Sequence, residues 1–244
     1  MMQPPPMPPA PYYGPASYAL VPAVPKPRGV PSRSPFLVGA TGHFFAAAMC
    51  IVYGIAVLLL SFFFYFGLSL IGLILEVILF VALVLHLVGF YGLWRNYGSG
   101  MAGATFAYGL VASIFFMVAS VLSMFAYQYL CYGYNCYPTL SFWGLILVLV
   151  SYVMLGVMFI LEGVAFLVVR RFTSLPGAAI AAGVLFIIGG SFVTSILLAF
   201  YGGFFVLAPA LIIGGVVLVK SPVPGLGAYP PGVPQYGMAP PGAM

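Results

Sequence analysis

The chain has 244 residues, of which 64% are hydrophobic and only 4% are charged, and its formal net charge is +5 at pH 7. Soluble domains carry charges on roughly a quarter of their residues, so this composition excludes a soluble globular protein and indicates one embedded in lipid. The basic residues are scattered singly or in pairs and form no continuous stripe that could track phosphates, which argues against nucleic acid as a partner. Their expected partner is the lipid bilayer with its anionic headgroups.

The N-terminal segment, residues 1–35, is rich in Pro and Tyr. It has few backbone donors and no apolar face to bury, so we expect a disordered tail that is partly polyproline II. Its stretch from Pro22 to Pro25, followed by Lys26 and Arg28, has a PxxP form that the aromatic-lined grooves of Pro-motif-binding proteins accept. A cytoplasmic partner of that class is one expectation, and a tail that is merely solvated is the other.

Residues 36–220 are predicted to form an all-α, polytopic bundle of six transmembrane helices. Lipid cannot satisfy an unpaired backbone group, and no segment alternates with the period of a barrel strand. The first two helices are divided on length alone, because about 55 apolar residues are too many for one crossing of roughly 30 Å. The six predicted helices are Leu37–Phe64, Leu68–Leu93, Met101–Tyr127, Leu140–Val169, Gly177–Phe200 and Phe204–Val219.

The sixth predicted helix is the shortest of the six. It would be roughly 24 Å long at 1.5 Å per residue, and Pro209 should bend it. A re-entrant hairpin that ends on the outer side is the alternative. Lys220 at its end favours a full crossing, because lysines gather on the cytoplasmic side.

The basic residues also predict how the chain is threaded. All of them precede the first helix or follow the second, fourth or sixth, which alternating crossings return to one side. The positive-inside rule therefore places both termini in the cytoplasm, in a cell membrane, with residues 221–244 as a second disordered tail rich in Pro and Gly. The seven are Lys26, Arg28, Arg33, Arg95, Arg170, Arg171 and Lys220.

Intramembrane ionisable residues are the candidates for transport: Glu76, His86 and Glu162, with His43 as a weaker addition. Helix rise places Glu162 about 12 Å and His86 about 13 Å from the inner edge, so the two can pair. Glu76 lies about 15 Å from His86 along the same helix, near its outer end. The structural interpretation is that these groups only hydrogen-bond across helices and stabilise their packing.

Cys131 and Cys136 lie close together in the longest external segment, from about Gln128 to Thr139. Outside the cytoplasm, two thiols at this spacing favour a disulfide, with free thiols as the alternative. A metal ion would need further ligands, which this segment does not offer. Cys50, inside the first predicted helix, is expected to be an inert core residue.

No phosphate-binding loop, zinc-protease motif or nucleophile motif occurs in a usable context, so we expect no enzyme, catalytic residue, cofactor or metal. Glycines within the helices predict close packing inside one chain, or else a homo-oligomer. The favoured function is a non-catalytic multi-pass membrane protein that organises the membrane or partner proteins through helix packing and its Pro-rich tails. The alternatives are a small secondary transporter or channel that uses the intramembrane Glu and His, and a membrane-bound thiol redox protein.

Overall fold

The computed structural model describes the backbone of residues 27–28, 30–62, 68–125, 127–132, 135–140, 142–195 and 202–223. Side chains are described for residues 27–28, 30–56, 73–122, 142–195 and 202–223. The disorder predicted for the two tails falls mostly on residues outside these ranges and stays a prediction.

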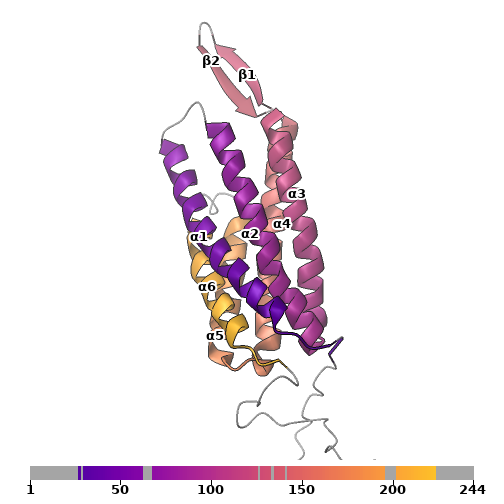
Figure 1. The fold of residues 1–244 in the computed structure, drawn as a ribbon. Coiled ribbons are helices and arrows are strands. Elements are labelled where there is room, and N and C mark those ends of the chain that lie inside the picture. The colour runs from indigo at the N-terminus through magenta and orange to yellow at the C-terminus, as the bar shows by residue number, and fades with distance from the viewer. Residues whose placement is uncertain are drawn as a thin grey trace, which may run out of the picture.

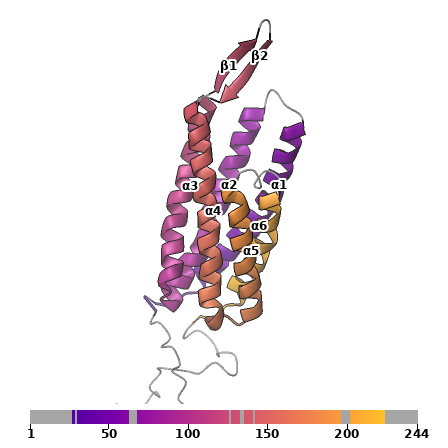
Figure 2. The same ribbon diagram turned by 180° about the vertical axis from the view of Figure 1, so that it is seen from behind.

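Six α-helices and a short 3₁₀ helix make up the helical bundle of the described chain (Figure 1). Helices that follow one another in the chain pack side by side, and the last packs on the first, so the bundle closes into a ring. Figure 2 shows the fourth and fifth helices next to each other. The elements are α1 (Ser34–Phe62), α2 (Leu68–Tyr97), α3 (Gly100–Phe125), α4 (Phe142–Val169), η1 (Arg170–Phe172), α5 (Pro176–Thr194) and α6 (Phe204–Lys220).

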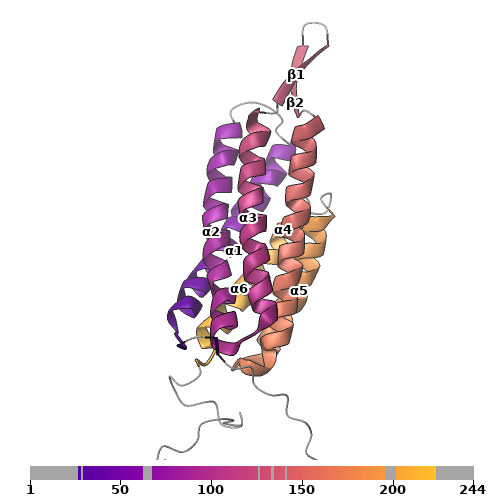
Figure 3. The ribbon, with the colours of Figure 1, turned by 90° about the vertical axis from the view of Figure 1, so that its right-hand side faces the viewer.

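The apolar helices support a protein embedded in a membrane. Among the described residues, five helices, α1 to α5, are long and apolar enough to cross one. Helix α6 is apolar but has only 17 residues. Figure 3 shows that α5 and α6 extend less far toward the strands than α3 and α4 do. Five crossings therefore follow from length and composition, and a sixth needs a further argument.

The division between the first two predicted helices is confirmed, and glycine explains how closely α1 and α2 pack. A Cβ built on Gly42 would lie 2.2 Å from the backbone nitrogen of His86, and one on Gly39 would lie 2.2 Å from Cα of Gly89. Any larger residue would meet backbone atoms there. In lipid, such close approach gains van der Waals contact that loosely packed helices lack.

Helices α4 and α5 approach each other in the same way. A Cβ on Gly163 would lie 2.5 Å from the carbonyl oxygen of Gly183, and one on Gly190 would lie 2.6 Å from that of Gly156. These glycines therefore serve packing within one chain, the first of the two roles expected for them.

Two short strands follow α3, where the sequence predicted an external loop from about Gln128 to Thr139. Strands β1 (Tyr127–Tyr132) and β2 (Asn135–Leu140) pair antiparallel, with Cys131 opposite Cys136. The predicted loop was thus partly wrong. Tyrosine is common in this segment and favours extended backbone, a preference that a search for apolar helices does not detect.

The end of the bundle opposite the strands holds both chain segments that lead into the tails. The backbone N–H of Arg28 donates to the carbonyl of Arg95 at 2.9 Å, and the Ser174 hydroxyl donates to the carbonyl of Lys220 at 2.6 Å. Figure 1 shows the beginning of α1 and the end of α6 at this end. The described Lys and Arg residues therefore share one end of the bundle, as their sequence positions predicted.

Candidate functional site

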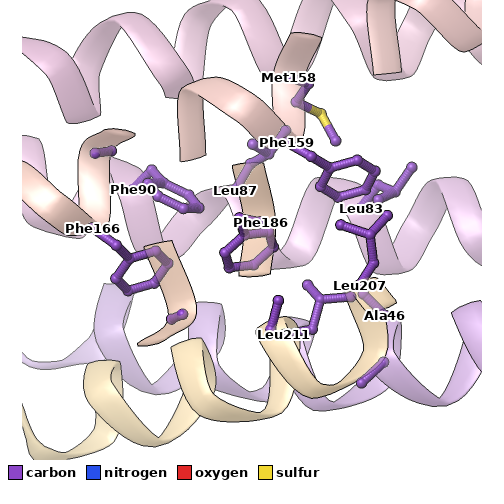
Figure 4. Close-up of a cluster of buried hydrophobic side chains, with 14 of the residues drawn as sticks. Ala46, Leu83, Leu87, Phe90, Met158, Phe159, Phe166, Phe186, Leu207 and Leu211 are labelled. Atoms are coloured by element: carbon purple, nitrogen blue, oxygen red, sulfur yellow. The ribbon is translucent and has the colours of Figure 1, made fainter. Parts of the chain in front are cut away.

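Four phenylalanine rings occupy the centre of the bundle, as Figure 4 shows. The ring of Phe186 on α5 stacks on Phe166 at a centroid distance of 5.7 Å and on Phe159 at 6.2 Å, both from α4. Phe90 of α2 meets Phe166 edge to face at 5.4 Å. All four are less than 2% exposed, so polar groups beside them are shielded from solvent.

The structure brings two of the three transport candidates together in this centre. Nε2 of His86, on α2, lies 2.6 Å from Oε1 of Glu162, on α4, and neither side chain has any exposed surface. The similar depths estimated from helix rise are thus matched by a direct contact. Phe159 stacks beside the imidazole, with ring centroids 6.4 Å apart.

His43 joins this pair from α1 and completes what we call the inner cluster: His43, His86 and Glu162. The two imidazole centroids are 5.1 Å apart, and Nδ1 of His43 donates to the carbonyl of Gly39 at 2.8 Å. Its depth was a usable signal, because ten residues from Arg33 correspond to about 15 Å, close to the level of the other two.

Each member of the inner cluster has one buried polar atom without a hydrogen-bond partner among the described residues. These atoms are Nε2 of His43, Nδ1 of His86 and Oε2 of Glu162. Buried polar atoms are nearly always partnered, so three together indicate a place that can hold a proton or a small hydrogen-bonding ligand. Within the described ranges, no group of three or more His, Cys, Asp and Glu is arranged to hold a metal ion.

Glu76, the third candidate, lies apart from the inner cluster, in an outer cluster drawn from four helices. Its carboxyl, on α2, hydrogen-bonds with Ser120 of α3 and Tyr53 of α1. The hydroxyl of Tyr53 lies 3.1 Å from that of Tyr152 on α4. Glu76 is only partly buried, in contrast to Glu162. The sequence alone did not point to Tyr53, Ser120 or Tyr152, because Tyr and Ser are frequent throughout the predicted helices.

The two clusters form two polar layers on the same three helices. In α1, α2 and α4 the members are ten residues apart, which is about 15 Å of helix. Buried apolar side chains, each less than 2% exposed, lie between them along the helices: Leu79, Leu83, Leu155 and Met158. The buried Ser113 hydroxyl of α3 bonds the Met158 sulfur at this level. The described residues therefore form two polar layers separated by a mainly apolar one.

The cysteine pair is placed only by its backbone. Directly opposed residues of an antiparallel pair have Cα atoms about 4.5–5.5 Å apart, a spacing that a disulfide requires. The side chains of Cys131 and Cys136 lie outside the described ones, so their disulfide stays a prediction. Cys50 is buried and free.

We expect the non-reduced, denatured protein to expose one reactive thiol, that of Cys50, and all three after reduction. Alkylation followed by mass spectrometry measures this count. Cys136→Ser is the matched control and should add one reactive thiol, that of Cys131, before reduction. Three alkylated thiols in the non-reduced wild-type protein would contradict the disulfide.

The comparisons with known proteins add no relative to this geometry. Against protein-family models, curated proteins and solved structures, the chain matches none.

Proposed function

We propose that this protein is a multi-pass protein of the cell membrane that crosses it six times, with both termini in the cytoplasm. It organises partner proteins or the surrounding membrane through helix packing and its Pro-rich tails, and it has no catalytic activity. One observation best supports this: the residues from which the two tails leave, near Ser32 and Pro222, are both hydrogen-bonded to the same end of a closed bundle.

The C-terminal end of α2 binds the chain segments next to both tails. The side-chain amide of Asn96 accepts from the backbone N–H of Ser32 at 3.0 Å and donates to the carbonyl of Ser32 at 2.8 Å. The neighbouring Tyr97 hydroxyl donates to the carbonyl of Pro222, which follows α6. Two tails that leave from one base at fixed spacing can engage a shared partner with a raised effective concentration.

The sixth crossing is supported by charge and by packing. Helix α6 spans about 25 Å at 1.5 Å per residue, and a bilayer adapts to a short span by local thinning at modest cost. It packs on both α1 and α5, and its exposed Lys220 lies at the basic end. Because Lys and Arg prefer the cytoplasmic side, this end is the cytoplasmic one in our proposal.

Deletion of residues 1–26 and 224–244 should abolish the organising activity and leave the bundle folded. Clustering in the membrane, measured by fluorescence recovery and single-particle imaging, is the readout, and thermal unfolding checks the fold. Glu76→Gln and Glu162→Gln are expected to cluster like the wild type. A tail-less protein that still clusters normally would refute the proposal.

A small proton-coupled transporter or channel is the second candidate, and the unpartnered atoms of the inner cluster favour it. Glu162 and His86 would then form the inner coupling site, with Glu76 near the external mouth. No described residue gives the thiol redox alternative comparable support.

In proteoliposomes, this second function predicts pH-dependent solute flux that is lost in Glu162→Gln. Ser191→Ala is the control, because Ser191 is exposed and bonds only the Ile187 carbonyl of its own helix. Absence of flux across a broad panel of solutes would count against transport and leave the organiser unaffected.

A further inference from the structure

We infer that the inner cluster is a proton-binding centre in which His86 and Glu162 share one proton and, together with His43, bind one water molecule. The inference goes beyond the organising function. It is compatible with an organiser and necessary, but not sufficient, for proton-coupled transport. It rests on the hydrogen-bonding capacities of the three buried side chains.

The tautomer of His43 follows from its contact with Gly39. A carbonyl oxygen only accepts, so Nδ1 of His43 must carry a hydrogen to make the 2.8 Å bond. A neutral imidazole has one N–H, and therefore Nε2 of His43 is a bare acceptor. This acceptor is buried and has no described partner.

The proton count of the His86–Glu162 pair follows from burial. Both side chains have no exposed surface, so a single uncompensated charge there is strongly disfavoured. A neutral imidazole beside a carboxylate carries one negative charge, and one added proton makes the pair neutral. In our inference that proton lies along the 2.6 Å contact, on Oε1 of Glu162 or on Nε2 of His86. Nδ1 of His86 then carries a hydrogen, and Oε2 of Glu162 is an acceptor.

The three unpartnered atoms are thus one donor and two acceptors. A water molecule can accept from Nδ1 of His86 and donate its two hydrogens to Nε2 of His43 and Oε2 of Glu162. Buried waters typically make about three hydrogen bonds of this kind. The imidazole centroids are 5.1 Å apart and nearly perpendicular, at 77°, so the two rings are close neighbours without a direct hydrogen bond.

Few other groups near the cluster can titrate. Cys50 of α1 lies close enough to Glu162 to interact with it electrostatically. The described neighbours from α5 and α6 include Phe186, Gly214 and Gly215, none of which titrates. On α3 the Ser113 hydroxyl bonds the sulfur of Met158, one helical turn before Glu162. The nearest other acid, Glu76, is about 15 Å away along α2. The charge of the centre is therefore set mainly by its own three members and Cys50.

Close packing holds the His43 ring in place. A Cβ on Gly214 would lie 3.0 Å from Cδ2 of His43 and 3.0 Å from Cζ of Phe166. The absence of a side chain at Gly214 therefore makes room for the His43 ring. The edge-to-face contacts with Phe166 and Phe186 surround the same ring. Such packing keeps Nε2 of His43 near His86 and limits exchange of the proton with bulk water.

The chain itself makes the test simple, because His43 and His86 are its two histidines. Nitrogen NMR of full-length protein with ¹⁵N-labelled histidine, in lipid nanodiscs, reports the tautomer of each ring. At neutral pH both histidines should carry a hydrogen on Nδ1, with contacts from slowly exchanging water to both rings. On raising the pH, His86 should lose that hydrogen as Glu162 becomes a carboxylate, and the His43 signals should shift at the same midpoint.

In Glu162→Gln this alkaline transition should disappear, because a neutral amide has no proton to lose to the pair. Glu76→Gln is the matched control, being the same change at the other acid, and should titrate like the wild type. The inference is overturned if wild-type His86 is protonated only on Nε2 at neutral pH. It is equally overturned if the two histidines titrate independently, or if Glu162→Gln keeps the transition. The wild-type tautomers decide even if that variant does not fold, and neither outcome depends on clustering or flux.

Discussion

Gly42→Leu is expected to lower the free energy of unfolding by about 3 kcal/mol or more, because overpacking forces the backbone to shift. The added Cβ would lie 2.2 Å from the backbone nitrogen and 2.6 Å from Cα of His86, atoms that no rotamer change can move. For a chain of this size the loss corresponds to roughly 6–12 °C in the midpoint of thermal unfolding. Scanning fluorimetry in a mild detergent measures it.

Gly177→Leu is the matched control for that change. Gly177 lies at the start of α5, is exposed, and has nothing within 4 Å of the Cβ position. It should unfold close to the wild-type temperature. An equal fall in the unfolding midpoint of both variants would show that replacing any helix glycine destabilises the protein. It would contradict a particular contribution of the α1–α2 contact to stability.

His86→Ala is expected to destabilise the bundle by about 3–5 kcal/mol, because it leaves the fully buried carboxyl of Glu162 without its partner. The double variant His86→Leu with Glu162→Met should recover most of this loss, since apolar side chains of similar volume often replace a buried pair at little cost. Thermal unfolding of His86→Leu, Glu162→Met and the double variant that combines them gives the coupling energy of the pair.

The double variant also separates the functional proposals. If the pair only links α2 to α4, the apolar double variant should fold and cluster like the wild type. If it couples transport, the same folded protein should lose all flux. Losses of the single variants that simply add in the double variant would contradict a direct interaction between the two side chains.

The pairing of His86 with Glu162 could be anticipated from the sequence because depth in a membrane helix is nearly one-dimensional. Counting residues from the basic helix ends gave the depth of both side chains along the membrane normal. The rotation of each helix about its axis could not be obtained in this way. Glu76 shows the consequence, because its partners Tyr53 and Ser120 are recognised only when α1, α2 and α3 have been oriented relative to one another.

The unpartnered atoms of the inner cluster are a second feature that no count of residues could supply. Whether these atoms have a hydrogen-bond partner depends on the space that Gly214 provides for His43 and on the carbonyl of Gly39. It also depends on the surrounding rings, which come from three helices. The two strands after α3 escaped prediction for a different reason. Their backbone pairing depends on local register, and six-residue segments carry little periodic signal.

The sequence alone determined that this chain belongs in a lipid bilayer and that its Lys and Arg residues gather at one end. Both follow from the energy of transferring single residues between water and hydrocarbon, which does not depend on neighbours. The tertiary structure alone decided which polar groups meet, which are enclosed, and where an apolar layer lies between them. These depend on helix rotation and on backbone contacts at glycines such as Gly39 and Gly42, and such packing is a property of pairs of helices rather than of either one.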